Sequence, residues 1–211
     1  MYQQVDDIQL GDREQISGNR YEFRTAWGDR RTNHSRTLYQ HNCFFNTARP
    51  FFGKDRYMVY RFTVGERTQL SANLEVQFSY CFEGAMTVEV SDDGRNWTVL
   101  TRLDKGHMRI NTPLPDEFLP AKAIWVRLTA ETERQLHFNS DMGAFGLRLI
   151  SYSSTVDGPP AYGMGKADYL EIHAVDSKLD VEITGLSKLV PGKQCTVTAR
   201  VTNHDSTVRR V

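Results

Sequence analysis

Aromatic, cationic and amide side chains are interleaved between Tyr21 and Asn46, a mixture suited to holding a ligand. Aromatic rings stack on the C–H faces of sugar rings, while amide, histidine and arginine groups fix hydroxyls. Arginines also bind carboxylate or sulfate groups through two parallel hydrogen bonds. We expect the ligand-binding residues of this stretch to be Trp27, Arg30, Arg31, His34, Arg36, Tyr39, His41 and Asn42.

Two other interpretations of the same stretch stay open. Single-stranded nucleic-acid binding uses the same stacking and cationic groups. Alternatively, the aromatic residues fill the base of a core while the arginines cover its surface. Trp27 is flanked by Gly28 in a polar run, so it is the aromatic residue that we expect to be partly exposed.

The charges of the chain balance in total but not along its length. The 211 residues include 26 Lys+Arg and 26 Asp+Glu, which argues against a dedicated nucleic-acid protein. Residues 13–67 hold 11 basic and 5 acidic residues, whereas residues 116–182 hold 11 acidic and 6 basic residues. We therefore expect no nucleic-acid partner, and a carbohydrate ligand that can be anionic.

Catalysis would need a constellation that the sequence does not display. Glycosidases use two carboxylates about 5–10 Å apart, and the candidates are Glu75, Glu89, Glu131 and Glu133. The favoured interpretation places these glutamates at solvent-facing strand positions opposite Arg or Lys. No H-E-x-x-H, G-x-S-x-G or P-loop motif occurs. We expect this chain not to be an enzyme, which is compatible with a catalytic domain elsewhere in a longer protein. The less favoured alternative is a jelly-roll lyase or hydrolase that uses His34, His41, Tyr39 and Arg36.

Hydrophobic residues alternate with a period of two in short segments, which is the signature of strands. These segments are 57–64, 74–82, 86–90, 97–100, 123–130 and 145–152. Asp92, Asp93 and Gly94 supply the turn chemistry of a hairpin between two of them. The pattern predicts an all-β fold, an antiparallel β-sandwich or jelly roll, with Trp97 and Trp125 in the core.

The three cysteines, Cys43, Cys81 and Cys195, show no C-x-x-C spacing. This argues against a zinc site and against a disulfide framework. We expect Cys81 and Cys195 to be small buried residues. No loop has the acidic ligand density that calcium requires, so we expect no cofactor, and metal content stays open.

A composition change marks a domain boundary near residues 153–165, which are rich in Gly and Pro. We expect a β-sandwich over 1–154, a linker over 155–177, and the incomplete start of a second domain over 178–211. Segments 179–183 and 195–201 alternate like strands, but two strands cannot bury a core of their own. The alternative is that they pack on the first sandwich.

Two resemblances refine this interpretation. The hairpin from Val88 to Leu100, with its Ser91–Trp97 turn, resembles that of galactose-binding-like β-sandwiches of the discoidin or coagulation-factor C type, as do segments 123–128 and 145–149. This resemblance covers residues 55–154, and residues 1–50 do not match it. Segments 179–183, 190–193 and 197–203 resemble the first strands of bacterial adhesion-type Ig-like domains.

These resemblances imply a function and a compartment. We expect a non-catalytic carbohydrate-binding module of a larger secreted polysaccharide-active or adhesion protein, with neighbouring domains as partners. The alternative is a structural β-sandwich that spaces or docks neighbouring domains. No apolar run is long enough to span a membrane. We expect an extracellular or periplasmic location, although Met1–Asp7 lacks a signal-peptide pattern and a cytoplasmic location stays open.

Overall fold

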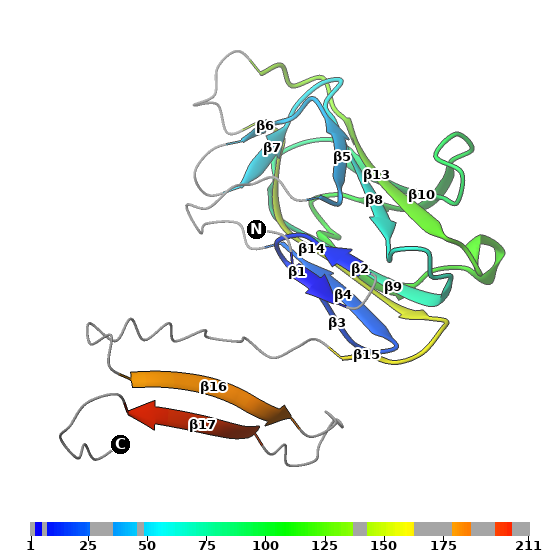
Figure 1. Ribbon diagram of the computed structural model, residues 1–211. Coiled ribbons are helices and arrows are strands. Elements are labelled where there is room, and N and C mark those ends of the chain that lie inside the picture. Colours follow the sequence, from blue (N-terminus) through cyan, green and yellow to red (C-terminus); the bar gives the residue numbers. More distant parts are fainter. Residues whose placement is uncertain are drawn as a thin grey trace. The chain divides into compact units, whose positions relative to one another are not determined.

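The computed structural model describes residues 3–5, 8–25, 36–45, 49–136, 143–162, 179–186 and 197–203. It divides the chain into two compact units, Met1–Gly163 and Met164–Val211. The described elements are strands, apart from a short 3₁₀ helix, η1 (Asp116–Phe118). The fold is an antiparallel β-sandwich, which confirms the predicted fold class (Figure 1).

One layer of the sandwich is a five-stranded sheet with the order β11-β10-β13-β8-β5. Its strands are β11 (Thr98–Leu103), β10 (Ala85–Ser91), β13 (Ala123–Glu131), β8 (Tyr57–Thr63) and β5 (Leu38–His41). Every neighbouring pair is antiparallel, and β10 carries a bulge against β11 between Val88 and Glu89.

The other layer is an eight-stranded sheet with the order β12-β9-β14-β4-β3-β15, in which β7 also pairs with β14 and with β6. Its strands are β12 (Arg109–Pro113), β9 (Gln69–Cys81), β14 (Phe145–Val156), β4 (Arg20–Arg24), β3 (Glu14–Gly18), β15 (Ala161–Tyr162), β7 (Pro50–Phe52) and β6 (Phe44–Phe45). A separate hairpin pairs β1 (Gln3–Val5) with β2 (Ile8–Leu10).

Aromatic side chains from both layers fill the space between the sheets. Phe62 on β8 stacks on Tyr152 of β14, with ring centroids 4.0 Å apart and planes 1° apart. Phe23 on β4 packs against Phe62 at 5.5 Å. The buried Tyr152 hydroxyl donates to Gln69 Oε1 at 2.7 Å, so its polar atom is satisfied inside the core. Cys43 and Cys81 are buried free thiols, as predicted for Cys81, while Cys195 lies outside the described residues.

The two tryptophans predicted for the core are not buried. Trp125 and Trp97 are both half-exposed, whereas Ile124, Val126 and Leu128 of β13 are fully buried. Alternation along an extended strand explains the error for Trp125, because successive side chains point to opposite faces. Since the even-numbered residues of β13 fill the core, Trp125 lies on the outer face.

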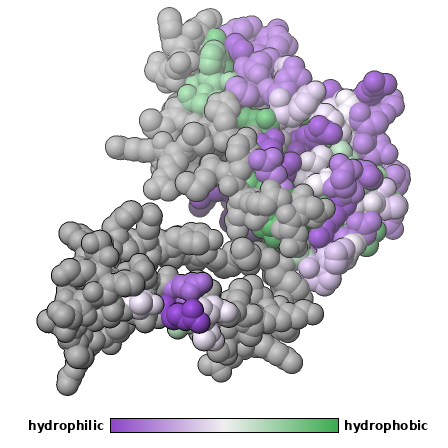
Figure 2. Space-filling view, viewed as in Figure 1, coloured by the Kyte–Doolittle hydropathy of each residue, from purple (hydrophilic) through white to green (hydrophobic). Residues whose placement is uncertain are grey.

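The end of β14 belongs to the first sandwich. This strand continues to Val156, and β15 pairs with β3 through Ala161 opposite Gly18. The segments 155–156 and 161–162 of the expected linker are therefore strand residues of the first unit. Figure 2 shows that the described surface of this unit is mostly hydrophilic in that view.

The second unit contains one described hairpin, β16 (Leu179–Leu186) and β17 (Val197–Asn203), with Val181 opposite Val201. These strands match the two predicted segments of the tail. That they open an Ig-like domain stays a prediction. Among the described residues of the chain, no helix is long and apolar enough to cross a membrane.

Candidate functional site

A groove of about 650 Å³ lies on the outer face of the five-stranded sheet. It is built where the outward-facing residues of β13, β8 and β10 come into register. Arg127 lies opposite Val59 and Glu89, and Thr129 lies opposite Tyr57. The lining residues are Tyr39, Gln40, Tyr57, Val59, Thr87, Glu89, Gly94, Trp97, Val99, Trp125, Arg127, Thr129 and Glu131.

Aromatic rings form one side of the groove. Tyr39, at the edge strand β5, is 59% exposed and meets Trp125 edge-to-face with ring centroids 4.6 Å apart. The Arg61 guanidinium lies over the Trp125 ring, 5.1 Å from its centroid. Gly94 of the β10–β11 turn packs against the same ring, because a Cβ there would come within 2.9 Å of Trp125 Cε2. The Trp125 ring is therefore fixed from several directions and presents a rigid apolar surface.

An ion pair forms the floor of the groove. Arg127 Nε and Nη2 donate to the two carboxylate oxygens of Glu89 at 2.6 and 2.7 Å, and Thr129 Oγ1 donates to Glu89 Oε2 at 3.2 Å. The Arg127 guanidinium also lies over the Trp97 ring, 4.2 Å from its centroid. This arrangement places charged donors and acceptors next to an aromatic face, with the Arg127 side chain still 32% exposed.

The β10–β11 turn positions Trp97. Ser91 Oγ accepts from Gly94 N at 2.9 Å, and Asp93 Oδ1 accepts from Arg95 N at 2.7 Å and Asn96 N at 2.8 Å. These backbone hydrogen bonds hold the pKa of Asp93 well below its usual range, since they stabilise the carboxylate. Gly94 adopts φ +71°, as the predicted turn chemistry requires. The turn chemistry expected of Asp92, Asp93 and Gly94 agrees with this geometry.

The far end of the groove is polar. Gln40 Nε2 donates to Tyr57 Oη at 2.7 Å. Glu131 accepts hydrogen bonds from Thr87 Oγ1 and from Arg102. The groove thus runs from an aromatic end at Tyr39 to hydroxyl, amide and carboxylate groups at its other end.

The carboxylates considered for catalysis are bound to different cations. Glu89 binds Arg127 and Glu131 binds Arg102, while Glu75 pairs with Arg109 at 2.7 Å and Glu133 pairs with Lys54. Each of these glutamates faces Arg or Lys, as expected. Glu131 and Glu133 are solvent-facing, whereas the Glu75 and Glu89 side chains are only 14% and 13% exposed. Within the described residues, no group of three His, Cys, Asp or Glu side chains could hold a metal ion.

Four of the eight predicted ligand-binding residues lie outside the described residues, namely Trp27, Arg30, Arg31 and His34. The other four do not converge on one site. Tyr39 lines the groove. Arg36 donates to the buried Glu14, with Nε 2.9 Å from Oε2, and to Thr63 O at 2.8 Å.

His41 and Asn42 contact the loop and strands beside β8. His41 packs edge-to-face on Phe45 at 5.0 Å. Asn42 Oδ1 accepts from Tyr57 N at 2.6 Å, and its Nδ2 donates to Asp55 O at 2.8 Å. The Asn42 side chain therefore holds the 55–57 backbone in place, and only Tyr39 among the described candidates belongs to the groove.

The groove contains residues that the sequence pattern does not assign to a site, above all Trp97, Trp125 and Arg127, while Glu89 is considered there only as a catalytic carboxylate. One signal for Trp125 and Arg127 was present in the sequence. Trp125, Arg127 and Thr129 occupy alternate positions of a strand. The residues between them are apolar and fill the core, so these three face away from it. The partnership of Arg127 with Glu89 had no such signal, because it depends on strand register.

Comparison with known proteins gives a structural likeness but no match in sequence. No protein-family description matches the sequence, and no curated protein is similar to it. Among solved structures, a chain described as a family 35 carbohydrate-binding module from an environmental isolate matches with a TM-score of 0.33 and 16% identity. The match covers 65% of this chain and 94% of that chain. A likeness at this level does not transfer a function, so what the chain binds has to be inferred from its own residues.

Proposed function

We propose that the chain is a carbohydrate-binding β-sandwich module and that the groove on its five-stranded sheet holds a sugar chain. The observation that carries this proposal is the conjunction of an exposed ring and two half-exposed rings with a hydrogen-bonding floor. Tyr39, Trp97 and Trp125 offer apolar faces for the C–H surface of a sugar ring. The Arg127–Glu89 pair beside them offers both donors and acceptors to hydroxyls.

The ion pair favours a neutral sugar in this groove. Glu89 already balances the charge of Arg127, and the bidentate geometry uses Nε and Nη2 while Nη1 stays available as a donor. A hydroxyl can donate to a carboxylate and accept from a guanidinium at the same time, so the pair suits vicinal hydroxyls. We infer that hydroxyl orientation, rather than net charge, decides which sugar is bound.

The wider context of the module is part of the same proposal. We propose a galactose-binding-like sandwich without catalytic activity of its own, in an extracellular or periplasmic protein with further domains. The hairpin at Ser91–Trp97 supports the first point, because its turn chemistry positions a groove residue. We also propose that residues 178–211 begin an Ig-like domain, which the β16–β17 pairing is compatible with.

The proposal is tested by isothermal titration calorimetry of the full chain against a panel of neutral oligosaccharides. We expect at least one to bind, and Tyr39→Ala to weaken that binding by about 10-fold, since one sugar face on a ring buries about 50 Å² of apolar surface at about 25 cal/mol per Å². Phe82→Ala is the matched control, because Phe82 is a 48% exposed aromatic residue outside the groove. Absence of binding across the panel, or equal affinity for wild type and Tyr39→Ala, would contradict the proposal.

A further inference from the structure

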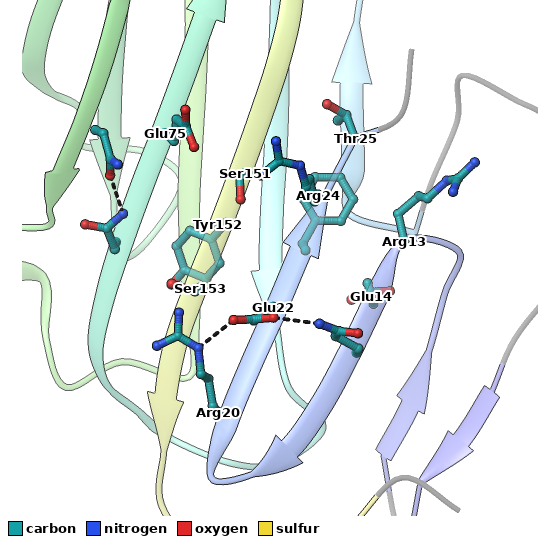
Figure 3. Close-up of a pocket in the computed structure, with 14 residues that line it drawn as sticks. Arg13, Glu14, Arg20, Glu22, Arg24, Thr25, Glu75, Ser151, Tyr152 and Ser153 are labelled. Atoms are coloured by element: carbon teal, nitrogen blue, oxygen red, sulfur yellow. Dashed lines mark hydrogen bonds and ion pairs between the residues drawn. The ribbon is translucent and has the colours of Figure 1, made fainter. Parts of the chain in front are cut away.

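The outer face of the eight-stranded sheet carries a second hollow, of about 610 Å³ (Figure 3). Its cause lies in the side chains of the central strand β14. Ser151 and Ser153 point out of the sheet between longer side chains, because Ser151 lies opposite Arg24 on β4 and Glu75 on β9. Ser153 in turn lies opposite Glu22 and Asn73. The short serines form the floor of a trough whose walls are polar.

The acidic groups of this trough are already neutralised. Glu22 accepts from Arg20 at 2.5 Å and from Gln15 at 2.6 Å. Glu75 pairs with Arg109 at 2.7 Å. The Glu14 carboxylate is buried and binds Arg36 at 2.9 Å.

The Arg24 guanidinium, at one end of the trough, is not neutralised in this way. Within the described part of the chain, no carboxylate contacts the Arg24 guanidinium, and Ser151 and Ser153 have no hydrogen-bond partner for their hydroxyls. Figure 3 shows Arg24 and Ser151 next to each other on the neighbouring strands β4 and β14. Arg13 lies at the rim, and its carbonyl accepts from Arg24 N at 3.1 Å. An exposed positive charge therefore lies beside the serine hydroxyls.

We propose that this trough is a second saccharide site, and that it takes an acidic sugar whose carboxylate or sulfate group binds Arg24 and Ser151. Guanidinium and hydroxyl donors are the groups that such oxyanions prefer. Ser153, Asn73 and Asn111 lie along the trough, where they can bind the hydroxyls of the same ligand. The aromatic residues that line it, Phe23 and Tyr152, are buried in the core, so it offers no stacking surface for nucleic-acid bases.

The two sites have separate determinants. The groove of the five-stranded sheet binds through aromatic rings and a neutral ion pair, whereas the trough binds through an unbalanced arginine. Binding at the trough is expected to weaken with salt, because its main contact is an exposed charge pair. Binding of a neutral sugar in the groove is expected to be nearly independent of salt.

Affinity electrophoresis and calorimetry of the full chain with polygalacturonate, dextran sulfate and neutral dextran test this inference. We expect one or both acidic polymers to bind at the trough and neutral dextran not to bind there. Binding of polygalacturonate would identify a carboxylate ligand, and binding of dextran sulfate a sulfate ligand. Arg24→Gln should weaken the binding about 10-fold, which corresponds to about 1.4 kcal/mol. Ser151→Leu should weaken it as well by filling the trough, while Trp97→Ala should leave it unchanged.

Arg95→Gln is the matched control, because it removes one exposed arginine charge from the other sheet's hairpin. Equal losses in Arg95→Gln and Arg24→Gln would overturn the inference, since they would indicate a response to net charge alone. It is also overturned if neither acidic polymer binds, if Trp97→Ala abolishes the binding, or if single-stranded DNA binds equally well with the same dependence on Arg24. The proposed function of the groove is tested separately, with neutral sugars and Tyr39→Ala.

Discussion

Replacing Arg127 by methionine removes one half of the ion pair on the groove floor and leaves Glu89 without its cation. The Glu89 side chain is 13% exposed, and after the change Thr129 Oγ1, at 3.2 Å, would be its one remaining hydrogen-bond donor among the described side chains. Breaking a fully buried pair costs about 3–5 kcal/mol, and an exposed pair contributes about 0–1 kcal/mol. Because Arg127 is 32% exposed, an intermediate cost of about 2 kcal/mol is expected.

The same change tests function separately from stability when it is combined with Glu89→Gln. Arg127→Met alone should lower the unfolding free energy by about 2 kcal/mol, a fall in Tm of about 4–8 °C, and should abolish measurable binding of the neutral sugar. The double variant has no unpaired carboxylate, so it should recover most of the stability while binding stays lost.

Urea denaturation followed by circular dichroism gives the stabilities, and calorimetry gives the affinities. If Arg127→Met is as stable as the wild type, the pair does not contribute as its geometry indicates. If the double variant regains both stability and binding, the ion pair is a structural feature of the sheet and not a part of a sugar site. Either result would refute the reasoning about the groove floor.

Three further predictions concern the scaffold. Phe62→Ala should lower the free energy of unfolding by about 3–5 kcal/mol in urea denaturation, because a fully buried stacked ring is lost. A loss below about 1 kcal/mol would contradict the packing of Phe62 in the centre of the core. Gly94→Ala should weaken sugar binding several-fold and lower Tm, since φ is +71° and the new Cβ would meet the Trp125 ring. Gly106→Ala is the control and should change neither quantity, because its Cβ would lie 3.4 Å from Asp104 Oδ1. Burial raises the pKa of Cys43 to about 12. The stability that its protonated form provides is therefore present below the unfolded thiol pKa of about 8.5 and is lost as the pH rises toward about 12. Mass spectrometry should find Cys43 unlabelled by iodoacetamide at pH 9 until denaturant is added, and rapid native labelling would contradict this.

The sequence predicts the long strands well, because each offers enough residues for a period of two. The segment 57–64 corresponds to β8 (Tyr57–Thr63), and the segment 123–130 to β13 (Ala123–Glu131). The N-terminal strands were not recognised. β3 and β4 contain five residues each and β7 contains three, and the charged and polar residues around them hide their alternation.

The candidate site was predicted only in part, for a physical reason. The expectation that Trp97 and Trp125 are buried followed from their place in alternating segments. In β13, however, the alternate positions that fill the core are Ile124, Val126 and Leu128, so Trp125 lies with Arg127 on the outer face. The contact of Arg127 with Glu89 joins residues 38 positions apart and arises from the register of β13 against β10. Register is set by pairing across the whole sheet, so a local sequence pattern does not contain it.

The arginines of the basic N-terminal region show why composition alone is a weak guide to a site. Arg36 was expected to bind ligand, yet in the structure it neutralises Glu14 and holds the chain before β5 to Thr63 at the end of β8. The excess of arginines over residues 13–67 includes Arg24, whose guanidinium has no acidic partner in the described part of the chain. The local charge count was informative, but only the partners of each side chain distinguish a structural arginine from one that is available to a ligand.

The central claim, that a sugar binds in the groove of the five-stranded sheet, is tested most directly through the indole N–H signals of the chain's three tryptophans. Titrating the neutral oligosaccharide that binds best into ¹⁵N-labelled protein, with assignments from Trp→Phe variants, shows which rings meet it. We expect the signals of Trp97 and Trp125 to shift with one common dissociation constant while that of Trp27 does not. A shift of Trp27 alone would move the site to the 26–35 stretch and would contradict the assignment to the groove.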